Sequence, residues 1–125
     1  MAPLYDEIYS ADAVVIGTPI YWFQVTGQTK TFIDRLLAFL YLKDGQPGNF
    51  RNKLKGKKTV TVFSQGQPDT SLFASNFDLT EGVLSIVGFK VRERIVAGGM
   101  RSEDDAKGNT AILEKAYAAG VGLTK

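Results

Sequence analysis

Residues 13–17 read Ala-Val-Val-Ile-Gly, an unbroken apolar run rich in β-branched side chains. Such a run is typical of a strand covered on both faces, as the strands of parallel sheets are. Before it, Leu4 and Ile8 recur at helical spacing, which predicts a short helix over residues 3–10. After it, residues 18–25 are expected to form a loop. The opening of the chain therefore predicts a helix, a buried strand and a loop.

Two further segments have the composition of strands, residues 59–63 (Thr-Val-Thr-Val-Phe) and residues 89–97. In the second of them, Lys90, Arg92 and Arg94 alternate with apolar residues. Because successive side chains of a strand point to opposite faces, this alternation predicts an edge strand with one face in water.

Apolar periodicity predicts three more helices, over residues 26–41, 71–87 and 109–123. In the helix over residues 71–87, a main apolar stripe is widened by further apolar residues, so we expect that helix to be well buried. The residues that widen it are Leu72, Leu79, Val83 and Ile86. Strands and helices thus alternate, which predicts one α/β domain over residues 1–125, with a parallel sheet and helices on both faces.

Composition excludes several classes of site. The chain has no cysteine and no histidine, so disulfides, Cys/His zinc sites, iron–sulfur clusters and Ser–His or Cys–His nucleophile pairs are excluded. A net charge of +2 gives little reason to expect nucleic acid binding. The lysines at positions 53, 55, 57 and 58 could bind nucleic acid or the 2′-phosphate of a nucleotide, but a solvated approach to a strand is the favoured interpretation. The first residues lack the apolar run of a signal peptide or membrane anchor, so a cytoplasmic protein without a membrane partner is expected.

Ligands of open parallel α/β sheets bind beyond the carboxyl ends of the strands. Three loops leave those ends here, over residues 18–25, 64–70 and 98–107. The first contains adjacent aromatic residues, whose faces suit a flat heterocycle, and the second contains Gly66, where backbone can approach a ligand closely. The alternative stays open that the Gly, Pro and Ser residues only form ordinary turns and that the aromatic residues pack beneath the loop.

The motif ADAVVIGTPIYW at residues 11–22, followed by VTG at 25–27 and KTFIDR at 30–35, resembles the NADPH-dependent FMN reductase superfamily. Within it, the sequence is most similar to the iron–sulfur flavoprotein branch. Weaker similarities are KGKK at residues 55–58, SQG at residues 64–66 and the pattern Ala-Tyr-x-x-Gly at residues 116–120. The resemblance implies a flavodoxin-like fold of three layers around a parallel sheet, and FMN lying across the strand ends.

By this resemblance the chain is an FMN-dependent NAD(P)H oxidoreductase of the flavin or quinone reductase type, with a small-molecule electron acceptor. A homo-oligomer is expected from the free edge of its first strand. Because the flavin carries the chemistry, no catalytic side chain and no metal are expected. The implied cofactor-binding residues are Thr18, Pro19, Ile20, Tyr21, Trp22, Phe23, Ser64, Gln65 and Gly66.

Members of that superfamily begin with two strands and a phosphate-binding loop that have no counterpart in these 125 residues. The expected domain is therefore partial, with three strands present and its first strand exposed at an edge. The FMN phosphate would lack its usual receptor, for which the helix starts at Thr26 and Ser71 are possible substitutes. Two alternative functions follow, a non-catalytic remnant that associates through the free strand edge and an electron-transfer module like flavodoxin.

Overall fold

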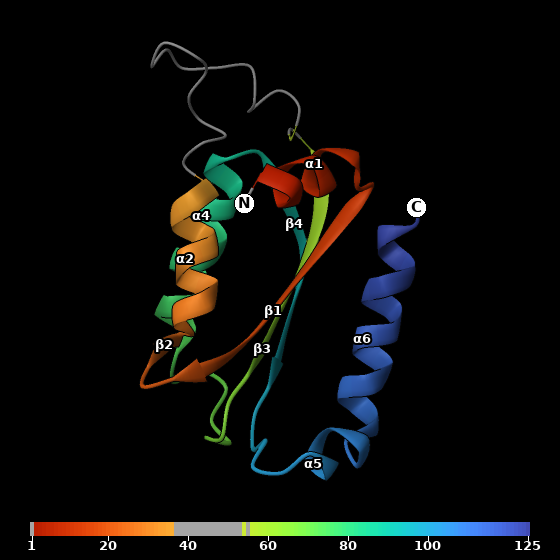
Figure 1. Ribbon diagram of the computed structural model, residues 1–125. Helices are drawn as coiled ribbons and strands as arrows, with labels where there is room; N and C mark the ends of the chain where they lie inside the picture. Colours follow the sequence, from red (N-terminus) through yellow and green to blue (C-terminus); the bar gives the residue numbers. More distant parts are fainter. Residues whose placement is uncertain (1, 37–53, 55) are drawn as a thin grey trace.

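A central sheet organises the computed structural model, which describes residues 2–36, 54 and 56–125 (Figure 1). The strand order is β2-β1-β3-β4, in which β1, β3 and β4 are parallel and the short β2 is antiparallel to β1. Along the chain the elements are α1 (Ala2–Ser10), β1 (Ala13–Tyr21), β2 (Gln24–Val25), α2 (Gly27–Arg35), β3 (Lys57–Ser64), α4 (Ala74–Ile86), β4 (Phe89–Ala97), α5 (Asp104–Lys107) and α6 (Thr110–Leu123). The predicted α/β class is confirmed, and three strands are parallel as predicted. The expected number of three strands is wrong, because the chain after β1 turns back and adds the antiparallel β2.

The predicted loop over residues 18–25 is wrong. Strand β1 continues to Tyr21 and the chain then reverses into β2, with Tyr21 opposite Gln24 and Ile20 opposite Val25. A proline such as Pro19 is tolerated within a strand that has an unpaired side. In the described part of the chain, the side of β1 that faces away from β3 is paired only at its last two residues.

Helices lie on both faces of the sheet, as predicted. Helices α1, α2 and α4 cover one face, and α6 covers the other (Figure 1). On the first face, Ile8 and Leu84 pack in one cluster with Phe89. On the second, Val60 packs with Ala119. Part of the predicted helix over residues 26–41, and most of the connection that follows it, lie outside the described residues.

Strand β4 occupies an edge of the described sheet, as predicted, but the prediction that Arg94 shares a wet face with Lys90 and Arg92 is wrong. Val91 pairs with Thr59, whereas the next pair is Glu93 with Val60, so Arg92 is the extra residue of a β-bulge. A bulge shifts the alternation of side chains by one position. Arg94 therefore faces α4, where its guanidinium binds carboxylates.

That ion pair connects β4 to α4. Arg94 donates from Nε to Glu81 Oε1 at 2.9 Å and from Nη2 to Glu81 Oε2 and Asp78 Oδ1, both at 2.6 Å. Thr61 Oγ1 donates to the same Glu81 at 2.6 Å, which brings β3 into the network. The hydrogen bonds that Arg94 donates to Glu81 are the main reason that the pKa of Arg94 lies above its ordinary value.

The prediction that α4 is well buried is only partly correct. Phe77 and Leu84 are buried against the sheet. The apolar residues that widen the stripe are instead exposed, with 71 % of Leu79 and 53 % of Ile86 open to solvent. The same holds for Leu72 and Val83. A helix on one face of a sheet buries only the side that meets the sheet, and this apolar stripe is wider than that side.

Lys57 has a structural role that the sequence does not predict. Its Nζ donates to the carbonyl oxygens of Ile8 and Tyr9, at the carboxyl end of α1. Lysine at this position satisfies free carbonyl groups and complements the helix dipole. Burial lowers the pKa of Lys57, an effect that nearby Asp12 partly offsets.

Candidate functional site

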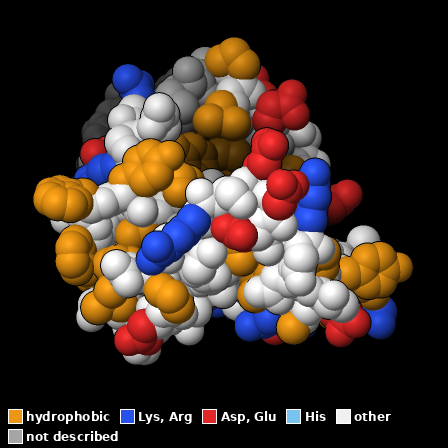
Figure 2. Space-filling model, turned by 90° about the horizontal axis from the view of Figure 1, so that it is seen from below, with side chains coloured by type: hydrophobic (Ala, Val, Ile, Leu, Met, Phe, Trp, Pro, Cys, Tyr) orange, Lys and Arg blue, Asp and Glu red, His pale blue; other side chains and the backbone are white. Residues whose placement is uncertain are grey.

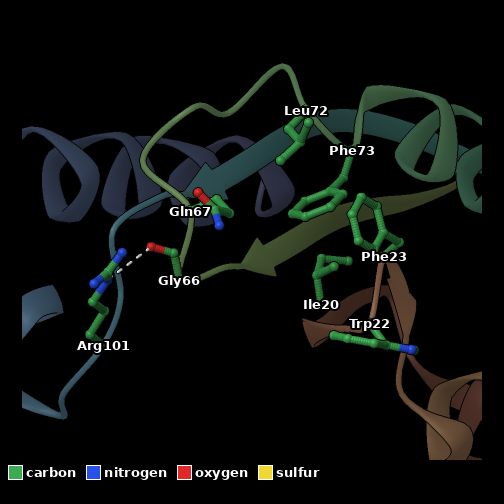
Figure 3. Close-up of a pocket in the computed structure, with 8 residues that line it drawn as sticks. All are labelled: Ile20, Trp22, Phe23, Gly66, Gln67, Leu72, Phe73 and Arg101. Atoms are coloured by element: carbon green, nitrogen blue, oxygen red, sulfur yellow. Dashed lines mark hydrogen bonds between the residues drawn. The ribbon is translucent and has the colours of Figure 1, made fainter.

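The carboxyl ends of β1, β3 and β4 meet at one edge of the sheet, and a pocket of about 320 Å³ lies there. Figure 2 looks onto this edge and shows apolar side chains gathered on one side of it. The pocket is lined by Ile20, Trp22, Phe23, Gly66, Gln67, Leu72, Phe73 and Arg101. In Figure 3 the aromatic residues lie at one end of the pocket, while Gly66 and Arg101 lie at the other.

The aromatic end is built on a hairpin turn in an unusual conformation. Trp22 and Phe23 connect β1 to β2 and have φ angles of 53° and 72°. Positive φ at both turn residues is the requirement of a type I′ turn, which favours Asn and Gly and disfavours bulky side chains. Trp22 is 93 % exposed and Phe23 is 61 % exposed. The turn thus holds two large aromatic side chains in solvent at the expense of backbone strain, a combination found at functional sites.

The interior packing beneath the turn holds this wall in place. The rings of Phe23 and Phe73 meet edge to face, with centroids 5.1 Å apart. Phe73 belongs to a buried cluster with Phe63, against which Ile20 packs. At the base of the hairpin Thr18 is buried, and its Oγ1 donates to the carbonyl of Pro19 at 2.9 Å.

The polar end is formed by the loop after β3. Gln65 is only 3 % exposed, and its Nε2 donates to the carbonyls of Gln67 and Asp69, both at 2.8 Å. Its backbone is tied to the loop after β4, since Gln65 N donates to Ala97 O and Met100 N donates to Gln65 O, both at 2.9 Å. Gln65 therefore shapes the loop from inside, while Gly66 and Gln67 face the pocket.

Close packing at Gly98 keeps the two loops together. A Cβ at this position would lie 2.9 Å from the carbonyl oxygen of Pro68 and 3.0 Å from Cγ2 of Thr70. These separations are shorter than van der Waals contact, so only glycine fits. The loop after β3 is thereby held against the end of β4.

Arg101 is the charged residue of the pocket, and it is not among the predicted site residues. Its Nε lies 3.5 Å from the carbonyl oxygen of Gly66. The backbone N–H groups of Arg101 and Ser102 both donate to Asp105 Oδ2 at 2.7 Å, and these bonds lower the pKa of Asp105. Arg101 could have been predicted from the sequence, because it is a basic residue in the third of the loops expected to surround a ligand.

Four of the residues implied by the family resemblance line the pocket, namely Ile20, Trp22, Phe23 and Gly66. The other five do not line it. Thr18 and Gln65 are buried, Pro19 and Ser64 are half-buried in paired strands, and Tyr21 is exposed. Leu72, Phe73 and Gln67 complete the wall without having been predicted. The cofactor contacts themselves remain predictions for all nine residues.

Comparison with known families identifies the architecture. A family model described as a flavodoxin-like fold matches residues 3–120. General stress protein 14 of Treponema denticola, solved in complex with FMN, superposes with a TM-score of 0.68 at 20 % identity, covering 98 % of this chain and 71 % of that one. At this identity the likeness establishes the fold alone.

Sequence relatives are more informative. An FMN-dependent NADH:quinone oxidoreductase of Methylorubrum populi is 34 % identical over 107 residues, which are 82 % of this chain and 53 % of that protein. An iron–sulfur flavoprotein of Archaeoglobus fulgidus is 32 % identical over 100 residues, 78 % of this chain and 41 % of that protein. The chain thus spans about half the length of such relatives, or less. Both kinds match at similar identity, so placement in the iron–sulfur branch stays a prediction.

None of the helices within the described residues is both long and apolar enough to cross a membrane.

Proposed function

This chain belongs to the flavodoxin-like fold family, and from that premise we propose that its pocket binds the isoalloxazine ring of FMN for electron transfer from NAD(P)H to a quinone. The observation that carries the proposal is the strained turn at Trp22 and Phe23, which presents aromatic faces opposite the backbone of Gly66. The relatives named as FMN-dependent NADH:quinone oxidoreductases support it.

The pocket fits the ring of the flavin better than its phosphate. A flat heterocycle with a polar edge needs apolar faces and backbone groups, which the aromatic wall and the Gly66–Gln67 segment offer. For the phosphate, Thr26 is a weak substitute, because its Oγ1 already accepts from Thr29 N and caps α2. Among the residues that line the pocket, Arg101 alone carries a positive charge.

FMN, when bound, would supply the hydride-accepting and electron-donating chemistry. The chain's own contribution is binding and orientation. Trp22, Phe23 and Phe73 offer aromatic surface at one end of the pocket, and the loop braced by Gln65 positions backbone groups at the other. No proton-transferring side chain is assigned to this reaction.

Fluorescence titration with FMN tests the proposal directly. Trp22 is the single tryptophan of the chain and lies in the pocket, so its emission reports on this site alone. We expect saturable quenching of both Trp22 and flavin emission, followed by turnover of NADH or NADPH with a quinone. Unchanged emission in excess FMN would exclude flavin binding by this chain. Flavin binding without quinone turnover would instead favour an electron-transfer module like flavodoxin.

The open side of β1 favours a second candidate function, association with another polypeptide. Within the described residues, Ala13 to Pro19 have a strand neighbour only on the β3 side, and Val15 is 59 % exposed. An unpaired apolar edge is a template for strand addition. Sedimentation at increasing concentration tests this function, and a monomer at all concentrations with no strand-adding partner would count against it.

A further inference from the structure

The guanidinium group of Arg101 is available to a ligand. No carboxylate in the described part of the chain lies within ion-pair distance of it, and its contact with Gly66 O at 3.5 Å is long for a hydrogen bond. Arg94, by contrast, is bound by two carboxylates. The guanidinium of Arg101 can therefore donate hydrogen bonds to a ligand at the rim of the pocket.

The backbone at Arg101 is anchored even though its side chain is not. Asp105 Oδ2 holds the N–H groups of Arg101 and Ser102 at 2.7 Å each. The carboxylate of Asp105 is therefore engaged with the backbone of this loop. An anchored backbone keeps the guanidinium near the pocket, and the long side chain can still adjust to what enters.

The two ends of the pocket differ in chemistry. Trp22, Phe23 and Phe73 form an uncharged aromatic end, while Arg101 supplies a positive charge at the other end, beside Gly66 (Figure 3). A ligand that satisfies both ends has an aromatic ring at one side and an oxyanion at the other. Arginine binds phosphate, sulfonate and carboxylate groups through paired N–H donors.

We propose that Arg101 forms an anion subsite, which selects flat aromatic ligands that carry an oxyanion group. This inference rests on the proposed function, since it assumes that the aromatic end binds a ring. The oxyanion has two possible sources, the phosphate of the flavin nucleotide and an acidic group on the electron acceptor. Both would make the same charge-assisted contact.

Two matched ligand pairs distinguish these sources. FMN and riboflavin share a ring and differ in the phosphate, while 1,4-naphthoquinone-2-sulfonate and 1,4-naphthoquinone differ in the sulfonate. Each is titrated into the wild-type chain, Arg101→Gln, Arg101→Lys and the control Lys107→Gln, with quenching of Trp22 as the readout. Lys107 is an exposed residue of α5 outside the pocket, so the control removes the same charge from a neighbouring position.

We expect Arg101→Gln to weaken binding of the anionic member of at least one pair by about five- to tenfold at low ionic strength. The neutral members should bind as before, Lys107→Gln should resemble the wild type, and Arg101→Lys should retain part of the preference. An effect confined to the flavin pair identifies the phosphate as the source, and one confined to the quinone pair identifies the acceptor.

If all four ligands quench Trp22 and Arg101→Gln changes neither preference, the anion subsite is refuted while the flavin proposal stands. If Lys107→Gln has the same effect as Arg101→Gln, the preference comes from overall charge, and the subsite is again refuted. If no ligand quenches Trp22 in the wild-type chain, the proposed function itself fails, and the anion subsite fails with it.

Discussion

Replacing Trp22 by asparagine should make the protein more stable. Trp22 has a φ angle of 53°, and the left-handed conformation costs a residue with a bulky side chain about 1–2 kcal/mol. Asparagine tolerates this conformation and is favoured in type I′ turns. The side chain of Trp22 is 93 % exposed, so its burial contributes little that could offset the strain.

The two contributions can be compared. A fully buried tryptophan removes roughly 250 Å² from solvent, and the small buried fraction of Trp22 is therefore worth about 0.4 kcal/mol. Subtracting this from the relief of strain leaves a net gain of about 0.5–1.5 kcal/mol in the free energy of unfolding. For a chain of 125 residues that gain raises Tm by about 2–6 °C.

Urea and thermal unfolding followed by circular dichroism would measure this gain. Tyr21→Asn is the matched control, because Tyr21 is also an exposed aromatic residue but lies in β1 and is not among the residues with positive φ. Asparagine there should destabilise, since it disfavours strands. A Trp22→Asn variant no more stable than the wild type would refute the strain argument. The same variant should lose about tenfold or more in FMN affinity, because an aromatic face of the pocket is gone.

Three other perturbations test the framework around the site. Glu81→Ala removes the main partner of the Arg94 guanidinium and should lower the free energy of unfolding in urea by about 2–3 kcal/mol. The double variant with Arg94→Met should lose less, because no unpaired charge is left, and equal losses in the two variants would contradict the coupling. Gly98→Ala should lower the free energy of unfolding by about 2 kcal/mol, because the added Cβ meets the carbonyl oxygen of Pro68. The control Gly120→Ala on α6 adds a Cβ that meets nothing and should raise the free energy of unfolding by up to about 1 kcal/mol. Because the pKa of Asp105 is lowered on folding, its contribution to stability is present above the unfolded pKa of about 3.9 and is lost as pH falls through the lower native value. The amide shifts of its two N–H partners should accordingly titrate below about pH 4 in an NMR pH series, and a midpoint above that value would contradict the assignment.

The order of elements was predictable because it depends on local patterns. The apolar run of β1 and the periodicity of α6 act over a few neighbouring residues, and the start of α6 is marked by Asn109, whose side chain accepts from Ile112 N. Hairpin β1–β2 was not predictable in this way. Proline and glycine beside the aromatic residues suggested a loop, whereas pairing between Ile20 and Val25 extends the strand.

The site was predictable only in part for a similar reason. Trp22 and Gly66 follow strands whose carboxyl ends must share an edge, so their convergence follows from the topology. The inward orientation of Gln65 depends on carbonyl groups that the folded loop brings together. The place of Arg101 likewise depends on the path of the loop after β4, which Asp105 determines.

The bulge at Arg92 limits how the length of β4 can change. Before it, Phe89 and Val91 face the layer of α1 and α4; after it, Ile95 faces α6 and Arg94 faces α4. Odd-numbered residues of β4 therefore face α1 and α4 before Arg92 and face α6 after it. Deleting Arg92 would remove the bulge, and Arg94 and Ile95 would keep both their β3 partners and their layers. A one-residue insertion that is not absorbed in a wider bulge would instead turn the guanidinium of Arg94 toward α6 and Ile95 toward the carboxylate of Glu81, so single deletions at the bulge should be tolerated better than single insertions.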